Sequence, residues 1–261
     1  MIPEKRQDAI LGLLKLRKMI SVEEIAKELN ISEMTARRDL TRMEESGHQI
    51  VKVRGGAKLL EDPDEAGTNY LNNRFYQQCL TCRREKEAIG KMAASLVQEN
   101  ETILIDAGST TFHFVGYLGG KAVTAIVTAT NIAEKLEGQE RVTTILTGGI
   151  FRSKTTTLIN PLLAQSLTQV YADKVFMGVT GISMSHGFMC HDFLEADVKK
   201  LLLQSGKEIY WLADSSKLNK MGTIQIADWQ PHDYLITDDG IEADIKEELT
   251  SKCRLLIATR R

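Results

Sequence analysis

The sequence predicts an α/β protein of two domains: a small N-terminal winged helix-turn-helix and a larger, mainly parallel α/β domain. Two observations support this prediction. Two short amphipathic helices joined by a tight turn lie between Ile20 and Asp39. From Thr102 onward, short apolar runs alternate with helical patterns. Strand–helix–strand repetition of this kind indicates a parallel sheet with helices on both faces.

Three helices are predicted in the N-terminal domain. Apolar residues at helical spacing indicate the first over Arg6–Leu16. The second begins at Ser21, with Glu24 three residues later, which is the spacing of a capping box. Asn30–Ser32 ends that helix and begins the third, with Ser32 placed as its N-cap.

The third helix has one small apolar face, formed by Ala36, Leu40 and Met43. Its opposite side is rich in arginine and threonine, which suits the DNA major groove because Arg bonds guanine bidentately and Thr contacts a thymine methyl or a phosphate. There are two alternatives: a solvated helix of an ordinary bundle, and a helix-turn-helix used only for protein contacts. The tight turn and both caps favour DNA. The residues predicted to contact it are Ser32, Met34, Thr35, Arg37, Arg38, Thr41 and Arg42.

A wing is predicted after the third helix. Gln49–Lys52 has the pattern of a strand and leads into a glycine-containing turn, so Lys52 and Arg54 are placed to touch the DNA backbone or minor groove. The polar stretch that follows has no period and contains Pro63 and Gly67, which is typical of a linker. The predicted domains are therefore residues 1–57 and 74–261, joined by a linker over 58–73.

Charge is distributed unevenly along the 261 residues. Residues 1–60 carry 12 Lys and Arg against 9 Asp and Glu, a net charge of +3. The net charge of the whole chain is −2, so the remaining residues carry a net charge of −5. A mildly basic N-terminal domain on an acidic body fits a DNA-binding module carried by a second domain. Because the charge is modest, two or more copies are expected to bind one site, which predicts a homo-oligomer.

Composition indicates a cytoplasmic protein. Hydrophobic residues make up 43%, and no apolar run approaches the roughly 20 residues that a membrane span needs. The first ten residues have no apolar signal core, and four cysteines do not make a disulfide framework in a chain of this length. Cys79 and Cys82 form a single close pair with no second pair after it, so no metal site is predicted.

The larger domain is predicted to begin with a helix from near Asn73 to Leu96. Seven apolar runs are predicted as strands, at Thr102–Ile105, Val123–Val127, Val142–Leu146, Lys174–Val179, Glu208–Ala213, Tyr234–Thr237 and Arg254–Ala258. Helices are predicted between them, at Thr111–Leu118, Ile132–Leu136, Leu162–Val170, Leu194–Gln204 and Glu242–Leu249. A parallel sheet of this kind binds ligands beyond the carboxyl ends of its strands.

Small polar clusters fall at those strand ends. After the first strand, Gly108 permits close backbone approach, and the hydroxyls of Ser109, Thr110 and Thr111 with free helix-terminal amides can hold a phosphate. A capped strand-to-helix turn is the alternative. No nucleotide P-loop or dinucleotide fingerprint is present, and no cofactor is predicted. Further clusters contain Asn131, Gly148, Gly178, Glu195, Lys199, Asp214 and Lys217.

Two of these clusters have a simpler interpretation. Glu195 and Lys199 are four residues apart on a predicted helix, so a helix salt bridge explains that pair by itself. Asp214 and Lys217 could form a surface ion pair. The recurrence of such clusters at successive strand ends favours instead one polyhydroxylated, phosphorylated ligand.

The chain resembles the DeoR-type bacterial transcriptional regulators over essentially its whole length. The resemblance rests on Ile31–Leu40 in the helix-turn-helix, Arg54–Ala57 in the wing, and a series of motifs in the larger domain. Those motifs contain Lys86, Ile89, Asp106–Thr111, Thr130-Asn131, Gly148-Gly149, Glu195-Ala196, Lys199, Asp214, Lys217 and Thr237-Asp238.

The resemblance implies a sensor domain with the fold of sugar-phosphate isomerases and deaminases, used for sensing rather than catalysis. Lys86, Asp214 and Lys217 would serve the response to the inducer, and the Asp106–Thr111 loop would hold its phosphate. The protein would be a repressor of a carbohydrate-utilisation operon that binds operator DNA and is released by a phosphorylated sugar. The alternative is a sugar-phosphate isomerase or deaminase with an accessory DNA-binding domain, in which Glu195, Asp214 and Asp106 would act as acid and base.

Overall fold

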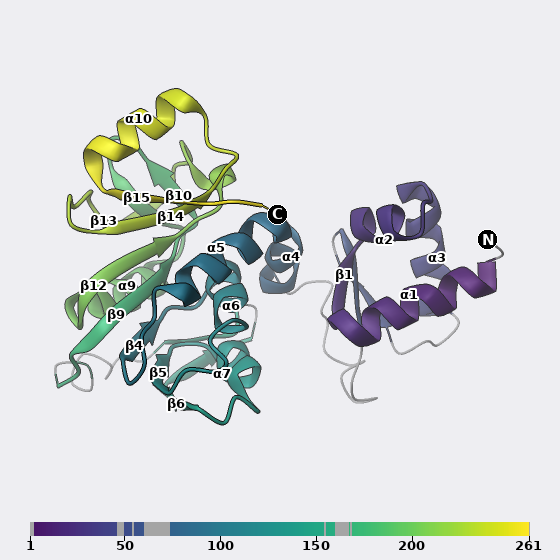
Figure 1. Cartoon of the computed structure of the whole chain (residues 1–261), viewed down its shortest axis with the longest axis horizontal. Helices are drawn as coiled ribbons and strands as arrows, with labels where there is room; N and C mark the ends of the chain where they lie inside the picture. Colours follow the sequence, from purple (N-terminus) through teal and green to yellow (C-terminus); the bar gives the residue numbers. More distant parts are fainter. Residues whose placement is uncertain are drawn as a thin grey trace. The chain divides into compact units, whose positions relative to one another are not determined.

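The computed structural model describes residues 3–45, 50–53, 55–59, 74–153, 155–159, 167 and 169–260. The chain divides into two compact units, a smaller one over Met1–Thr81 and a larger one over Cys82–Arg261 (Figure 1). Of the predicted linker, Lys58 and Leu59 belong to a strand, and residues 60–73 lie outside the described part. The predicted domain boundaries stay a prediction.

The smaller unit contains the three expected helices: α1 (Pro3–Arg17), α2 (Val22–Glu28) and α3 (Glu33–Glu45). The capping box at the start of α2 is confirmed, because the Glu24 amide donates to Ser21 Oγ at 3.1 Å and the Ser21 amide donates to Glu24 Oε2 at 2.9 Å. Ser32 caps α3 by accepting from the Thr35 amide at 3.2 Å. Both predicted helix starts therefore have their physical cause in the structure.

The core of the smaller unit is small and apolar, and one buried ion pair fastens α1 to α3. Ile10, Ile25, Ala36 and other side chains of the three helices have no exposed surface. Arg6 donates to both carboxylate oxygens of Asp39, with Nε to Oδ2 at 2.6 Å and Nη2 to Oδ1 at 2.9 Å. This hydrogen bonding raises the pKa of Arg6. Asp39 itself is 1% exposed, so its carboxylate depends on Arg6 rather than on water. The ion pair therefore fixes the orientation of α3 relative to α1.

The wing is a three-stranded antiparallel sheet in the order β1-β3-β2, made of β1 (Met19–Ser21), β2 (Ile50–Val53) and β3 (Gly56–Leu59). The predicted strand Gln49–Lys52 corresponds to β2, whereas β1 was not predicted. Gly56 passes so close to β1 that a Cβ there would lie 2.1 Å from the Ile20 carbonyl oxygen, so only glycine fits. Arg54 lies outside the described residues.

The larger unit contains a seven-stranded sheet in the order β15-β14-β12-β9-β4-β5-β6, with every neighbouring pair parallel. The predicted strands are confirmed as β4 (Thr102–Ile105), β5 (Val123–Val127), β6 (Val142–Leu146), β9 (Ala172–Gly178), β12 (Gly206–Leu212), β14 (Tyr234–Asp238) and β15 (Arg254–Ala258). Four of them have the predicted bounds, and the other three differ by one or two residues.

The helices between the strands are α6 (Ser109–Val115), α7 (Thr130–Leu136), α9 (Phe193–Gln204) and α10 (Ala243–Lys252). The single helix predicted from Asn73 to Leu96 is wrong: α4 (Arg74–Leu80) and α5 (Arg83–Ser95) replace it. The break falls at Cys82, whose φ of 51° is left-handed and cannot continue a helix. The predicted helix Leu162–Val170 falls largely outside the described residues.

Two hydrophobic clusters cover the two faces of the sheet. Helices α5, α6 and α7 bury their apolar sides on one face, and α9 and α10 on the other. Successive residues alternate between the faces: Ile103 and Ile105 join the first cluster, whereas Leu104 joins the second. This period of two explains why the central strands read as nearly continuous apolar runs, since both of their faces are buried.

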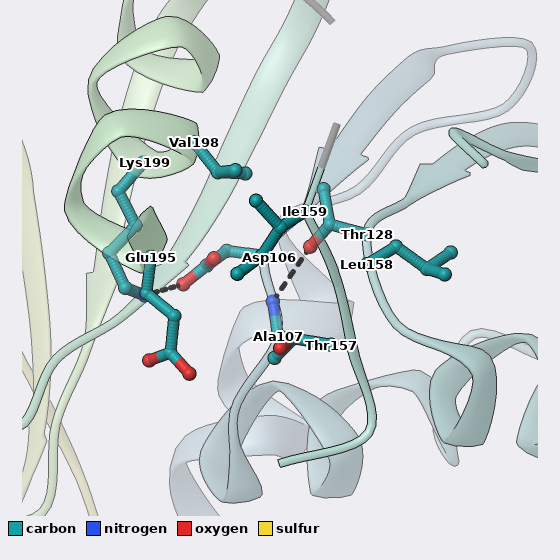
Figure 2. A pocket seen from close by; sticks show the side chains of 9 residues that line it. All are labelled: Asp106, Ala107, Thr128, Thr157, Leu158, Ile159, Glu195, Val198 and Lys199. Atoms are coloured by element: carbon teal, nitrogen blue, oxygen red, sulfur yellow. Dashed lines mark hydrogen bonds and ion pairs between the residues drawn. The ribbon is translucent and has the colours of Figure 1, made fainter. Parts of the chain in front are cut away.

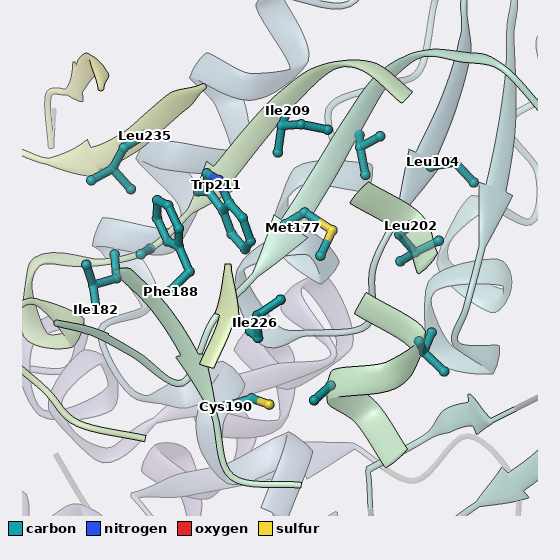
Figure 3. Packing of buried hydrophobic residues seen from close by; sticks show 14 of the residues in the cluster. Leu104, Met177, Ile182, Phe188, Cys190, Leu202, Ile209, Trp211, Ile226 and Leu235 are labelled. Atoms are coloured by element: carbon teal, nitrogen blue, oxygen red, sulfur yellow. The ribbon is translucent and has the colours of Figure 1, made fainter. Parts of the chain in front are cut away.

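Short antiparallel strands that the sequence did not reveal complete the larger unit. They are β7 (Ile150–Arg152), β8 (Thr157–Ile159), β10 (Gly181–Ser183), β11 (Gly187–Cys190) and β13 (Ile224–Ala227). A short 3₁₀ turn, η3 (Ser215–Lys217), follows β12. Phe188 of β11 stacks on Trp211 of β12, with ring centroids 3.8 Å apart and planes 4° from parallel (Figure 3). This stack joins the small sheet β10-β11-β13 to the main sheet.

Candidate effector and DNA-binding sites

The order of the parallel sheet identifies one position where a ligand is expected. From β4 the chain proceeds outward through β5 and β6, then returns to β9 on the other side of β4 and proceeds outward through β12, β14 and β15. The direction of winding therefore reverses between β4 and β9. In open α/β sheets, ligands bind beyond the carboxyl ends of the strands at such a switch point. Asp106 follows β4, and Gly178 ends β9.

A buried ion pair occupies the switch point. The Lys199 ammonium of α9 contacts Asp106 Oδ2 and donates to the Gly178 carbonyl at 2.9 Å, while the Gly178 amide donates to Asp106 Oδ2 at 3.0 Å. Asp106 is 2% exposed, and burial raises its pKa against the opposing effect of Lys199. The interpretation of Glu195 and Lys199 as a plain helix salt bridge is wrong, because Lys199 pairs across the sheet end with Asp106.

This ion pair lies in a small pocket between α9 and β8. Figure 2 shows Glu195 and Lys199 on one side, Thr157 and its neighbours on the other, and Asp106 between them. The cavity volume is about 10 Å³, which is room for a single water molecule. The lining residues are Asp106, Ala107, Thr128, Thr157, Leu158, Ile159, Glu195, Val198 and Lys199.

Thr128 and Thr157 were missed by the sequence analysis. Thr128 Oγ1 accepts from the Ala107 amide at 3.0 Å, which fixes the loop after β4 (Figure 2). Thr157 is brought to the pocket by the pairing of β8 with β7. A polar residue directly after β5 was the available signal for Thr128; no local pattern marks Thr157.

Glu195 is the carboxylate in this pocket that has no hydrogen bond or ion pair among the described residues. Burial raises its pKa, against the opposing effect of Lys199. Asp192 caps the same helix, accepting from the amides of Leu194 at 3.0 Å and Glu195 at 3.1 Å. Its other oxygen accepts from Arg152 Nη1 at 2.7 Å, a contact the sequence analysis missed.

The predicted phosphate loop is compact and largely buried. Helix α6 begins at Ser109, two residues earlier than predicted, and Ser109, Thr110 and Thr111 are each less than 10% exposed. Thr111 Oγ1 donates to the Gly108 carbonyl at 2.9 Å. Gly108 and Gly178 bring the ends of β4 and β9 together, since a Cβ on Gly108 would lie 3.7 Å from the Gly178 Cα. The loop therefore lies directly beside the switch point.

A second buried ion pair lies at the end of β12. Lys86 Nζ of α5 is 3.8 Å from Asp214 Oδ2, and both side chains are almost fully buried. Ser216 Oγ donates to Asp214 Oδ1, whereas Asp214 Oδ2 accepts no hydrogen bond from any described residue. The alternative of a surface ion pair between Asp214 and Lys217 is wrong, because Asp214 faces Lys86 in the interior. Lys217 is half-buried and has no side-chain partner among the described residues.

The remaining predicted effector residues lie outside the pocket lining. Asn131 is 4% exposed in the first turn of α7, and neither its amide nitrogen nor its amide oxygen has a hydrogen-bond partner in the described chain. Gly148 follows β6 with a φ of +68°, a left-handed turn that favours glycine. Lys86, Asp214 and Lys217 are likewise absent from the lining.

In the smaller unit, α3 presents the predicted DNA-contacting face to solvent. Ser32, Met34, Arg37, Arg38 and Arg42 are exposed, with Met34 at 67%. Arg37 pairs with Glu33 at 3.3 Å, whereas Arg38 and Arg42 have no side-chain partner in the described part of the unit. Two free guanidinium groups on one helix face are suited to phosphates or guanine edges.

The wing is connected to this face by Lys52. Its ammonium donates to Thr41 Oγ1 at 3.0 Å and lies 3.8 Å from Glu44, and its amide donates to Glu44 Oε1 at 2.8 Å. Thr41 in turn donates to the Arg37 carbonyl at 2.9 Å. Lys52 and Thr41 therefore hold β2 against α3 as well as lying beside the predicted DNA face.

Three further properties of the described residues concern metal sites, disulfides and membrane-spanning helices. No group of three His, Cys, Asp or Glu side chains in the described ranges could hold a metal ion. All four cysteines are free thiols. No described helix is long and apolar enough to cross a membrane.

A winged helix-turn-helix unit with a free arginine face and a parallel α/β unit with a polar site at its switch point define a two-domain transcriptional regulator. The DeoR-like helix-turn-helix domain matches residues 6–62, and the DeoR C-terminal sensor domain matches residues 81–239. The chain belongs to the DeoR family. The family resemblance predicted from the sequence is confirmed.

Similar proteins span almost the whole chain. The HTH-type transcriptional regulator GolR of Listeria innocua is 36% identical, over 92% of this chain and 92% of its own. The HTH-type transcriptional repressor GlcR of Bacillus subtilis is 34% identical, over 91% of this chain and 89% of its own. Among solved structures, ribose 5-phosphate isomerase A of Methanocaldococcus jannaschii aligns with a TM-score of 0.41 and 19% identity, over 54% of this chain and 57% of that one.

Proposed function

We propose that this regulator is a repressor of a carbohydrate-utilisation operon, and that a phosphorylated sugar bound by the larger unit releases it from operator DNA. The smaller unit would bind the operator through α3 and the wing. The larger unit would bind the sugar at the switch point between β4 and β9. Because an effector shifts an equilibrium only by binding one state better, the sugar must favour an arrangement of the protein that binds DNA poorly.

The observation that carries the proposal is the group formed by Asp106, Lys199 and Glu195 at the switch point. Glu195 offers a carboxylate that is unpartnered among the described residues and can accept sugar hydroxyls. Beside it, the first turn of α6 offers the hydroxyls of Ser109 and Thr110, together with backbone amides that have no partner within the helix, a suitable environment for a phosphate. A polyol with a phosphate at one end would satisfy both groups.

The cations near the proposed site favour a ligand that brings few negative charges. Lys199 is paired with Asp106, Lys86 with Asp214, and Arg152 with Asp192. Lys217 is then the cation of the proposed set that has no carboxylate partner in the described chain. A single phosphate group would therefore suit the site better than a bisphosphate or a nucleotide.

Thermal unfolding with a panel of sugar phosphates tests the proposal. A specific ligand at a hundred times its Kd stabilises the folded state by about 2.7 kcal/mol, which raises the melting temperature measurably. The same sugar should release the protein from a promoter fragment in a gel-shift assay. A panel in which no sugar phosphate changes either property would contradict the proposal, and inorganic phosphate serves as the control for simple anion binding.

We further infer that the larger unit binds the sugar without converting it. Two of the three candidate catalytic carboxylates, Asp106 and Asp214, are each committed to a lysine, which leaves Glu195 as a single candidate acid or base. The proposal is tested by incubating the protein with its ligand and following the sugar by NMR. Isomerised or deaminated product at about 1 s⁻¹ or faster would support the enzymatic alternative.

The remaining expectations follow from this function. The protein would act in the cytoplasm. It would be a homo-oligomer, because two DNA-binding units on a pseudo-palindromic site bind far more tightly than a single unit of modest charge. Gel filtration with light scattering, together with the length of the protected operator, would test the oligomer.

A further inference from the structure

The pocket at the switch point is too narrow in this structure to hold a sugar phosphate. Its volume of about 10 Å³ is far below the roughly 300–1,000 Å³ of ordinary small-molecule sites. One wall is β8 with Thr157, Leu158 and Ile159, and the other is α9 with Glu195 and Lys199 (Figure 2). A sugar phosphate can enter only if these two walls move apart.

One side of the hairpin β7–β8 is held by backbone hydrogen bonds. The Leu158 amide donates to the Thr128 carbonyl at 2.8 Å, and the Thr130 amide donates to the Thr156 carbonyl at 3.2 Å. These bonds attach β8 to the segment that follows β5. The hairpin is therefore anchored to that half of the sheet, and any opening of the pocket has to occur on its α9 side.

On the α9 side, the described residues make a single polar contact with the hairpin. Arg152 Nη1 of β7 donates to Asp192 Oδ2 at 2.7 Å. Arg152 is also the direct partner of Thr157 in the β7–β8 ladder, so its position determines where that pocket residue lies. Asp192 is the N-cap of α9, three residues before Glu195. One ion pair thus joins the two walls of the pocket at its edge.

We propose that the Arg152–Asp192 pair is a latch that holds the hairpin β7–β8 against α9 and keeps the effector pocket closed until a ligand enters. Arg152 is then a positioning residue, which acts through the wall it holds rather than by touching the ligand. The role of the latch in ligand binding rests on the proposed function, whereas its role in closing the pocket does not.

The exposure of the pair suits a latch that a ligand can open. The side chains of Arg152 and Asp192 are 36% and 33% exposed. Ion pairs this accessible to water are weak. A weak contact lets the open state be populated to a small extent, and ligand binding to that state draws the equilibrium toward it.

Three variants separate the latch from a general loss of charge. Arg152→Gln removes the cation. Asp192→Asn removes the anion but keeps the helix cap, because Asn is as good an N-cap as Asp. Arg141→Gln is the matched control, since it breaks another exposed pair of the same unit, Arg141 with Glu99 at 3.3 Å, away from the pocket.

Hydrogen exchange of the ligand-free protein tests the closing role. Amides of Ile150–Arg152 and Thr157–Ile159 should exchange about two- to fivefold faster in both latch variants, the range expected for loss of a partly exposed ion pair. Exchange there should be unchanged in Arg141→Gln. Unchanged exchange in both latch variants, with the proteins folded as judged by their melting temperatures, would overturn the latch.

Calorimetric titration with ribose 5-phosphate, glucose 6-phosphate and fructose 1-phosphate tests the ligand role. Both latch variants should bind the active sugar phosphate more tightly than wild type, by up to about fivefold, because the open state is more populated. Weaker binding by Arg152→Gln together with tighter binding by Asp192→Asn would show that Arg152 contacts the phosphate, which contradicts the latch. If no sugar binds wild type or any variant, the proposed function fails, and the exchange experiment alone decides whether the latch exists.

Discussion

The ammonium of Lys199 contacts the carboxylate of Asp106, although 93 positions separate the two residues in the chain. The contact joins α9 to the end of β4 across the switch point of the sheet. Because both side chains are buried, water cannot solvate the charge that remains when its partner is removed. The pair therefore contributes to the stability of the larger unit as well as to the chemistry of the proposed site.

Replacing Lys199 with Met should destabilise the protein by about 3–5 kcal/mol at pH 7.5, because a buried carboxylate loses its counter-charge. The loss should be smaller at pH 5, since Asp106 can then take up a proton and become neutral. Urea denaturation at the two pH values measures both effects. Lys200→Met is the matched control, because Lys200 is exposed on the same helix. An equal, small effect of the two substitutions would contradict the importance of the buried pair.

Replacing Glu195 with Gln should make stability less dependent on pH. Burial raises the pKa of Glu195 above its unfolded value of about 4.3. The folded state then binds the proton more tightly than the unfolded state, so stability falls as pH rises from about 4.3 through the folded pKa. The variant should melt at a higher temperature than wild type at pH 7.5, and the difference should vanish near pH 4.

Melting curves from pH 4 to pH 8 check this expectation. Glu247→Gln, at an exposed position of α10, should show no such trend. A constant difference between Glu195→Gln and wild type across the whole range would mean that the carboxyl group is not responsible.

Replacing Arg6 with Gln should clearly destabilise the smaller unit, because the buried carboxylate of Asp39 loses its counter-charge. Arg17→Gln is the control: Arg17 also pairs with a carboxylate, Glu28, but the Glu28 side chain is 45% exposed, so the loss of stability should be much smaller. Hydrogen exchange of the α3 amides reports this unit alone. Similar exchange in the two variants would show that the buried pair stabilises the smaller unit no more than the exposed pair does.

Replacing Arg38 with Ala should weaken binding to a cognate promoter fragment by about 1–3 kcal/mol if the side chain reads a base, with a smaller effect on unrelated DNA. Arg38 is exposed on α3 and has no side-chain partner among the described residues, so the free protein should be no less stable. Lys27→Ala, which removes one positive charge from α2, is the control. Equal affinity of wild type and Arg38→Ala for the promoter would remove Arg38 from the predicted interface.

Replacing Lys217 with Ala should leave operator affinity unchanged but make repression unresponsive to the inducing sugar. Lys217 lies after β12, at the carboxyl edge of the sheet, and its ammonium has no partner in the described chain that could absorb the change. A reporter assay with and without sugar measures the outcome, with the exposed Lys220→Ala as the control. Normal induction in the Lys217 variant, with the protein present at wild-type levels, would exclude it from sensing.

The central part of the main sheet was predictable because its strands are buried on both faces. Runs such as Thr102–Ile105 and Val123–Val127 are almost entirely apolar, and flanking polar residues mark their ends. The short strands β7, β8, β10, β11 and β13 were not predictable, because each has three or four residues and depends on partners elsewhere. The break at Cys82 was missed because nothing in its neighbours breaks a helix; only its left-handed φ does.

The candidate site was predictable as a set of strand ends but not as a set of contacts. Spacing along the helix favoured Glu195 as the partner of Lys199, and the tertiary structure overrides it with Asp106. In the same way Asp214 turns inward to Lys86 rather than outward to Lys217. Arg152 matched no motif used in the sequence analysis, because its importance depends on Asp192, forty residues further along the chain.

The stack of Phe188 on Trp211 also determines what an optical experiment can observe. The chain has two tryptophans, both in the larger unit: Trp211 is fully buried in the stack, and Trp229 lies 4.8 Å from the Phe188 ring. Tryptophan fluorescence therefore reports the layer around β11 and carries no signal from the DNA-binding unit. Circular dichroism records both units, so a difference between the two signals during denaturation would resolve their unfolding without any label.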